Sequence, residues 1–152
     1  MEAVITAVFD TNVILQGILS PDGPAAVCVS LAFNGDIQLI TTNEILSEIE
    51  DVISRPRLTA KYPQLLGDRR IHIVEKMREF AAVVARPPSI YRLERDRSDE
   101  VFIDLALTYG VDYLLSRDRD ILDLSRDYDF RSTYPGLTVV SPVGFLETFR
   151  KS

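Results

Sequence analysis

The apolar run from Ala3 to Phe9, Ala-Val-Ile-Thr-Ala-Val-Phe, is followed directly by Asp10-Thr11-Asn12. An apolar, β-branched run of this length predicts a buried strand, so the polar residues after it stand at the edge of a sheet. In open parallel sheets, the carboxyl ends of the strands form the ligand crevice. Asp10 therefore has two interpretations. It is a ligand for a cation in that crevice, or the N-cap of a helix that begins near Val13.

The size and composition of the chain fit one globular domain, residues 1–152. A chain of 152 residues can bury a hydrophobic core, and its apolar content of 46% argues against disorder. It contains no run of about 20 apolar residues that would cross a bilayer. It also lacks a basic, cleavable leader at its start. We therefore expect a cytoplasmic protein that does not contact membranes.

The residue types exclude several kinds of active site. The single cysteine, Cys28, lies in an apolar stretch and is expected in the core, and the single histidine, His72, is expected at the surface. These expectations exclude zinc sites built from Cys and His, and His-based catalytic triads. The net charge of −6 argues mildly against non-specific binding to nucleic acid. That argument weakens if several of the acidic residues gather on a metal.

Short apolar strands alternate with helical patterns along the chain. Strands are predicted at 3–9, 37–40, 82–85, 113–115 and 137–140. Helices are predicted at about 13–18, 24–34, 43–54, 67–80, 99–109, 119–125 and 143–150. The stretch from Arg86 to Tyr91, with two adjacent prolines, is predicted to be a surface loop. This alternation predicts an α/β fold with a mostly parallel sheet and helices on both faces.

Two acidic residues that follow the second predicted strand are candidates for the same crevice. Glu44 and Thr41 match a capping box, which gives Glu44 a structural role. Glu48 lies at the margin of the apolar stripe of the helix, where it can point into the crevice or remain a surface side chain. We prefer Glu48 for its place on the helix, and Glu44 remains the alternative.

The helix predicted over 99–109 begins with two acidic residues. Ser98 is its predicted N-cap, so Asp99 falls in the first turn, where the helix dipole favours an anion. The dipole explains one acidic residue in that turn but not two. Asp104, in the middle of the helix, is expected to be exposed.

The motif Ser116-Arg117-Asp118 follows the fourth predicted strand and repeats the arrangement at Asp10. Adjacent parallel strands would bring both motifs to one edge of the sheet. Asp120 and Asp123 follow, and either one is a further ligand or an exposed helix charge. Converging carboxylates repel one another and raise one another's pKa. A hard divalent cation such as Mg²⁺ or Mn²⁺, which prefers oxygen ligands, would relieve that repulsion.

With these motifs the sequence resembles the PIN-domain ribonucleases, especially the PIN toxins of prokaryotic toxin–antitoxin systems. The resemblance covers nearly the whole chain. It rests on Asp10-Thr11-Asn12, on Glu48, on Asp99 seven residues before Ala106, and on Ser116-Arg117-Asp118. It implies a PIN-like three-layer α/β/α fold with a five-stranded, mostly parallel central sheet. Ser116 stands where threonine is more common in the family, and it keeps the hydroxyl group.

The resemblance also implies a metal-dependent endoribonuclease. The catalytic residues, which would bind one or two Mg²⁺ or Mn²⁺ ions, would be Asp10, Glu48, Asp99 and Asp118. A further candidate ligand is Asp120. Water would attack an RNA phosphate in line and leave a 5′-phosphate and a 3′-hydroxyl.

Other residues would support the acidic site. Asn12 and Ser116 would orient the metal ligands through hydrogen bonds. The first candidates for contact with the RNA phosphates are Arg117 and Arg119. Further candidates are Arg95, Arg97 and Tyr91, although a tyrosine beside prolines can simply pack on them. The resemblance also implies two protein partners, a second copy in a homodimer and a cognate antitoxin.

Two other functions compete with this interpretation. A phosphatase that forms an aspartyl phosphate would need a second acid two places after Asp10, where the chain has Asn12, and a lysine near a later strand end. The other alternative is a catalytically silent PIN module that binds RNA or acts as a scaffold. A silent module should have lost acidic residues, whereas this chain has a candidate for each of the four.

Overall fold

A computed structural model describes residues 4–65, 69–93 and 97–151, and a five-stranded sheet lies at its centre. The strands are β1 (Ile5–Phe9), β2 (Ile37–Thr42), β3 (Ala82–Val84), β4 (Tyr113–Leu115) and β5 (Thr138–Val140). Their order across the sheet is β3-β2-β1-β4-β5, and every neighbouring pair is parallel. The parallel α/β sheet predicted from the sequence is confirmed.

The order of the strands creates a switch point between β1 and β4. From β1 the chain moves to β2 and β3 on one side, and it later returns to place β4 and β5 on the other side. At such a point the loops after the two strands diverge and leave a crevice, where open α/β sheets bind ligands. Because Phe9 is in register with Leu115, the residues that follow both strands meet at this crevice.

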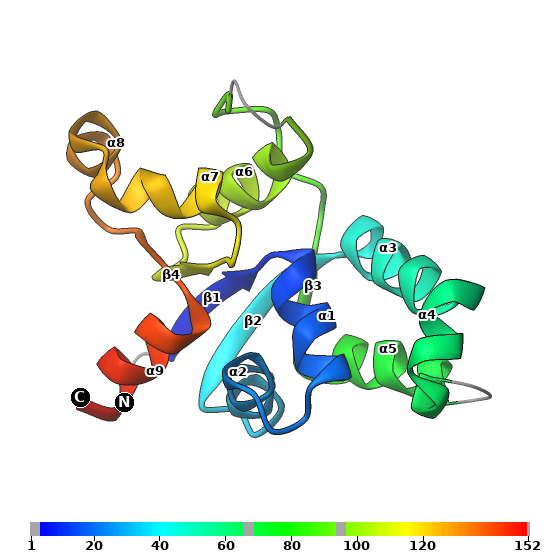
Figure 1. The fold of residues 1–152 in the computed structure, drawn as a ribbon. Helices are drawn as coiled ribbons and strands as arrows, with labels where there is room; N and C mark the ends of the chain where they lie inside the picture. Colours follow the sequence, from blue (N-terminus) through cyan, green and yellow to red (C-terminus); the bar gives the residue numbers. More distant parts are fainter. Residues whose placement is uncertain (1–3, 66–68, 94–96, 152) are drawn as a thin grey trace.

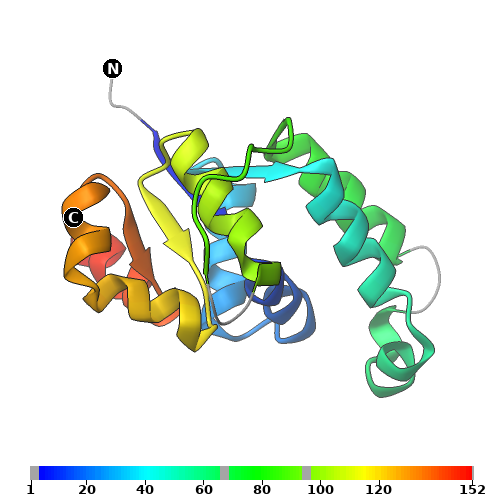
Figure 2. The ribbon, with the colours of Figure 1, turned by 90° about the horizontal axis from the view of Figure 1, so that it is seen from above.

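Helices cover both faces of the sheet. In Figure 1, α1 (Thr11–Leu19), α2 (Pro24–Phe33) and α9 (Pro142–Lys151) lie below the sheet, and α6 (Glu100–Thr108) and α7 (Arg119–Leu122) lie above it. Figure 2 shows a group at the side of the sheet, formed by α3 (Asn43–Ile53), α4 (Pro56–Lys61) and α5 (Arg69–Phe80). The remaining described helices are α8 (Tyr128–Thr133) and the 3₁₀ turns η1 (Pro63–Leu65), η2 (Arg97–Asp99) and η3 (Asp123–Arg126).

The core lies between the sheet and these helices. Fully buried side chains come from β1, from β4 and from the helices on both sides, among them Phe9, Leu114, Leu46 and Ile103. Cys28 is buried in α2, where its thiol lies 3.8 Å from the carbonyl oxygen of Pro142, and His72 is exposed, as the sequence predicts for both.

The structure also corrects parts of the prediction. Helices α4 and α8 were not predicted, and the helix predicted over 119–125 is divided into α7 and η3. Strand β2 continues to Thr42, so Thr42 rather than Thr41 caps α3, with its hydroxyl accepting a hydrogen bond from the Ile45 N–H at 3.2 Å. The predicted capping box between Thr41 and Glu44 is therefore wrong.

Within the described ranges, no single helix is long and apolar enough to cross a membrane. The pair α1 and α2 passes that test by length and composition together, but the two helices are bent by 99° at the break between them.

Candidate functional site

Asp10 lies between β1 and α1 and is only 2% exposed. Its Oδ1 accepts a hydrogen bond from the Val13 N–H at 2.8 Å, which caps α1. Its own N–H donates to the carbonyl oxygen of Leu115 at 3.0 Å, which extends the pairing of β1 with β4 by one residue. The helix-cap interpretation of Asp10 is therefore correct. It leaves the second carboxylate oxygen, Oδ2, to face the end of β4.

Ser116 joins Asp10 to Asp118. The Ser116 side chain is fully buried, and its hydroxyl donates to Oδ2 of Asp10 while accepting a hydrogen bond from the Asp118 N–H at 2.9 Å. Asp118 is half-buried and caps α7, with its Oδ1 accepting from the Asp120 N–H at 2.8 Å. The two strand ends thus form one hydrogen-bonded unit at the switch point, as the sequence predicts.

The carboxylate of Asp10 lies in an environment that disfavours its charge. Burial raises the pKa of Asp10, and the nearby Asp118 carboxylate also raises it. The hydrogen bond from the Ser116 hydroxyl opposes this rise, as do those from the backbone N–H groups of Val13 and Arg117. A buried carboxylate beside a second one is favoured in its ionised form when a cation lies between them.

Two threonine hydroxyls near these strand ends have no hydrogen-bond partner in the described part of the chain. They belong to Thr11, the residue after Asp10, and to Thr41, near the end of β2, and both Oγ1 atoms are buried. Buried hydroxyl groups are usually satisfied by protein, water or ligand atoms. These two therefore add unused donors to the carboxyl edge of the sheet.

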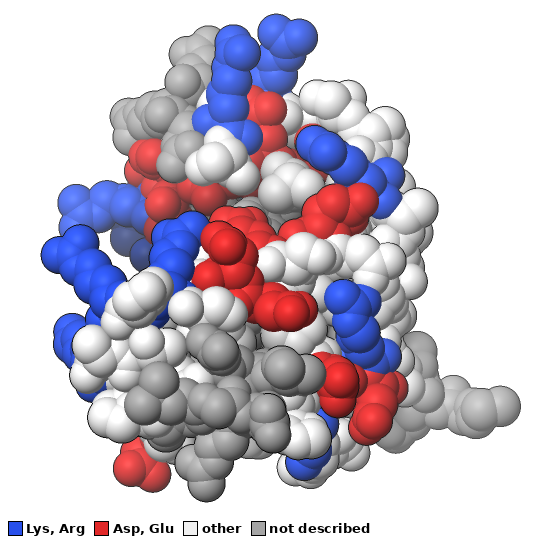
Figure 3. Space-filling view, turned by 90° about the vertical axis from the view of Figure 1, so that its right-hand side faces the viewer, with Lys and Arg blue, Asp and Glu red and all other residues white. Residues whose placement is uncertain are grey.

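A cavity of about 410 Å³ opens at the carboxyl end of β2. Glu44 and Glu48 both line it from α3, and both are exposed. Arg86 and Arg97 line it as well. Figure 3 shows acidic side chains gathered across the middle of the face that carries α3, with Lys and Arg side chains around them. Because both glutamates reach this cavity, Glu48 as the second acid stays a prediction.

The remaining predicted acidic ligands lie at helix starts. Asp99 ends η2 and occupies the N-cap position of α6, so the prediction that Ser98 caps this helix is wrong. Asp99 and Asp120 are both half-buried, and Asp120 lies in the first turn of α7. Asn12 is exposed in the first turn of α1.

The predicted phosphate contacts lie around these acidic residues. Arg117 and Arg119 are exposed on either side of Asp118. Arg95 falls outside the described residues. Tyr91 is half-buried and packs edge-to-face on Phe130 of α8, with ring centroids 5.3 Å apart. Tyr91 therefore packs on α8, which the sequence did not suggest.

Sequence reasoning missed the role of Asp104. It was expected to be exposed, but it is 5% exposed, and its Oδ1 accepts hydrogen bonds from the Ile90 N–H at 3.0 Å and the Tyr91 N–H at 2.8 Å. One turn earlier in α6, Glu100 accepts from the Leu93 N–H at 2.9 Å. These carboxylates hold the segment after β3 against α6, and both line the same cavity as Glu48.

The donor chemistry of the switch point fits a hard divalent cation. The carboxylates of Asp10 and Asp118 supply oxygen ligands, and the pKa of Asp10 is raised by its burial and, to a smaller extent, by the nearby Asp118 carboxylate. No group of three or more His, Cys, Asp or Glu side chains suited to a metal occurs in the part of the chain that the structure describes. Mg²⁺ is commonly held by one or two carboxylates together with water and substrate phosphate. Asp10 and Asp118 supply ligands of that type and number.

Comparison with known proteins agrees with the geometry of this edge. The family model of the PIN domain matches residues 6–120, which is more than half of the chain and contains both strand-end motifs. The chain belongs to the PIN domain family. It is also similar to the uncharacterized protein MJ1680 of Methanocaldococcus jannaschii, at 28% identity over 148 residues that cover 97% of this chain and 93% of the relative. No solved structure gives a significant match.

Membership of the PIN family accounts for the fold and for the general class of chemistry. PIN domains have an α/β/α arrangement with a parallel central sheet, which is the architecture found here. They are generally nucleases that use divalent metals. The match ends at Asp120, so η3, α8, β5 and α9 lie beyond it.

Proposed function

We propose that this PIN domain is a metal-dependent endoribonuclease that hydrolyses RNA phosphodiester bonds. One observation carries the proposal. The buried carboxylate of Asp10 is held by Ser116 beside Asp118, at the switch point of a parallel sheet. A structural cap needs only the bond to Val13, whereas the second carboxylate and its shared serine point to ligation.

Asp10 and Asp118 would hold an Mg²⁺ or Mn²⁺ ion. Glu48, Asp99 and Asp120 are further ligands in this proposal. A bound divalent cation would supply Lewis-acid stabilisation of the negative charge that develops on the phosphate oxygens during hydrolysis.

The chain's own residues orient this site. The hydrogen bonds from Val13 and Ser116 fix both oxygens of Asp10, so the carboxylate is held in place before substrate binds. Ser116 also fixes the backbone at Asp118. Arg117 and Arg119 are exposed beside Asp118 and would contact the phosphates that flank the cleaved bond, because guanidinium groups bind phosphate through paired hydrogen bonds.

The proposal is tested by incubating the purified protein with an end-labelled single-stranded RNA in Mg²⁺, in Mn²⁺ and in excess EDTA. We expect cleavage with either metal, none in EDTA, and products with 5′-phosphate and 3′-hydroxyl ends. Asp10→Asn and Asp118→Asn should each lower the rate at least 100-fold.

Asp36→Asn is the matched control for these variants, because Asp36 is exposed just before β2 begins, at the opposite end of the sheet. It should cleave RNA at the wild-type rate. Equal cleavage by the wild-type chain and Asp10→Asn, or products with 2′,3′-cyclic phosphates, would overturn the mechanism.

The proposal also includes a biological role as the toxin of a toxin–antitoxin pair, in the cytoplasm. The support is the resemblance of the four acidic motifs to PIN toxins. Induced expression in a bacterial host should stop growth with the wild-type chain and not with Asp10→Asn. Normal growth with an active enzyme would remove the toxin role and leave the ribonuclease proposal intact.

A catalytically silent RNA-binding module is the second candidate function. It is favoured by one observation, that the described residues form no group of three or more metal-binding side chains. Tight RNA binding by the wild-type chain with no cleavage in either metal would select this alternative.

A further inference from the structure

Two hollows adjoin along the outer side of β5, away from the carboxylate of Asp10. One, of about 550 Å³, is lined by Arg119 and Arg126. The other, of about 710 Å³, is lined by Tyr128, Arg131 and Tyr134. Ser125 and Val139 line both hollows, so the two are adjacent. Together they form a path that starts at Arg119, the residue after Asp118, and follows η3 and α8.

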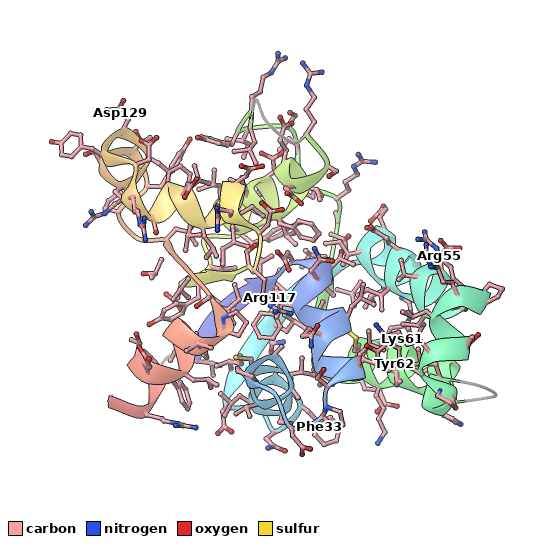
Figure 4. All side chains as sticks on the ribbon, viewed as in Figure 1. Phe33, Arg55, Lys61, Tyr62, Arg117 and Asp129 are labelled. Carbon is pink, nitrogen blue, oxygen red and sulfur yellow. The ribbon has the colours of Figure 1, made fainter. Side chains whose placement is uncertain are left out.

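Figure 4 shows where the segment that borders these hollows lies. Arg117, next to Asp118 in the chain, lies near the middle of the molecule, and Asp129 marks the outer end of α8. The segment between them is α7, η3 and the start of α8, and η3 packs against β5. The hollows thus lie along a segment that runs from next to Asp118 to the margin of the protein.

The arginines on this path are available to bind anions. Arg119, Arg126 and Arg131 are exposed, and no ion pair is recorded for them within the described ranges. Two of the neighbouring carboxylates serve as helix caps, with Asp118 accepting from the Asp120 N–H and Asp127 from the Phe130 N–H. Asp123 also lines the first hollow, so the charged residues that line the two hollows are three arginines and one aspartate, and this excess of positive charge favours a polyanion as the ligand.

The path also presents aromatic rings. Tyr128 is 80% exposed, which is unusual for a residue that normally gains by burying its ring. Tyr134 is half-buried and packs on Phe130, with ring centroids 5.2 Å apart, so its position is fixed. Exposed aromatic rings beside arginines are the combination on which unpaired nucleic-acid bases stack while their phosphates are bound.

We propose that these joined hollows bind the single-stranded RNA on one side of the cleavage site. Arg119, Arg126 and Arg131 contact successive phosphates, and Tyr128 stacks on a base. A single strand fits this surface because its bases are free to reach the tyrosine ring, whereas the bases of a duplex are paired and stacked on one another. This inference rests on the proposed ribonuclease function and adds the length and form of RNA that the enzyme recognises.

The test measures RNA binding by the full-length Asp10→Asn protein, so that cleavage does not interfere. A fluorescein-labelled, unstructured 12-nucleotide RNA is titrated at several salt concentrations and followed by fluorescence anisotropy. Each phosphate contact contributes about 0.7 to the slope of log Kobs against log salt for single strands. Adding Arg126→Gln and Arg131→Gln should therefore reduce that slope by about 1.4.

Matched controls separate a local contact from a general change of charge. Arg57→Gln with Arg150→Gln removes the same charge from exposed positions on α4 and α9 and should leave the slope unchanged. Tyr128→Ala should weaken binding about 5- to 150-fold, the range expected for the loss of one stacked base, and Tyr128→Phe should restore it.

The results distinguish this inference from the ribonuclease proposal. The proposed RNA path would be wrong if the double variant at Arg126 and Arg131 left the salt slope of RNA binding unchanged, or if this variant and its charge control gave equal slopes. Either result would count even if the wild-type chain cleaves RNA. Equal affinity for the same sequence as a duplex would overturn it as well. Cleavage by the wild-type chain is scored separately and tests only the proposed function.

Discussion

Replacing Ser116 with alanine tests the link between the two strand ends. The Ser116 hydroxyl is fully buried, donates to the carboxylate of Asp10 and accepts from the Asp118 N–H. A hydrogen bond to a charged group contributes about 1.5–3 kcal/mol, and leaving the N–H of Asp118 without its acceptor adds to the loss. We therefore expect Ser116→Ala to lower the free energy of unfolding by about 2–4 kcal/mol. The pKa of Asp10 should also rise further, because Ser116 holds it down.

The assay is urea unfolding at neutral pH in EDTA, followed by far-ultraviolet circular dichroism because the chain has no tryptophan. For a domain of this size, the expected loss corresponds to a fall in Tm of about 4–16 °C. Ser125→Ala is the control, since its hydroxyl is exposed and bonds to the nearby Leu122 carbonyl, and it should change stability by less than about 0.5 kcal/mol. If Ser116→Ala is as stable as that control, the serine does not join the strand ends as described.

Three further predictions concern single side chains. Asp104→Ala should lower the free energy of unfolding by about 2–3 kcal/mol, because the N–H groups of Ile90 and Tyr91 lose their acceptor. In the same urea titration, Asp104→Asn should lower it by less than half as much. Burial raises the pKa of Asp10 above its ordinary value of 3.8, so the unfolded chain loses this proton at a lower pH than the folded chain does. The contribution of Asp10 to folding stability therefore falls as the pH rises above 3.8. In EDTA, the wild-type chain should thus lose stability relative to Asp10→Asn as the pH rises from 3.8 to 7, and a stability difference between the two that stays constant over this range would refute this sign. Burial raises the pKa of the Cys28 thiol to about 12, so Ellman's reagent should react with it only after unfolding, and rapid reaction with the native protein would contradict its burial.

The sheet and the Asp10 edge could be predicted because both depend on local patterns. A short apolar run followed by polar residues that include an acid identifies a strand and its exposed end. This occurs at Asp10, directly after the run, and again at Asp118, which follows Ser116 and Arg117. The rule that parallel strands share their carboxyl edge then brings the two motifs together. The hydrogen bonds through Ser116 confirm that step.

Features that depend on tertiary contacts could not be predicted. Asp104 was placed at the surface because nothing in the pattern of its helix shows that the segment at Ile90 and Tyr91 crosses it. The direction of α3 relative to the sheet decides whether Glu48 or Glu44 reaches the metal, and a single helix does not encode that angle. Helix α8 was missed because it has only six residues, too few to show a helical period.

The most direct test of the central claim is binding of Mn²⁺ to the metal-free protein, measured by electron paramagnetic resonance of the free ion. We predict saturable binding by the wild-type chain, unchanged binding by Asp36→Asn, and at least a tenfold loss of affinity in Asp10→Asn, because a removed ligand should cost no less than a removed supporting contact. Equal Mn²⁺ affinity for Asp10→Asn and the wild-type chain would contradict the account, because the metal would then lie somewhere other than the edge formed by Asp10, Ser116 and Asp118.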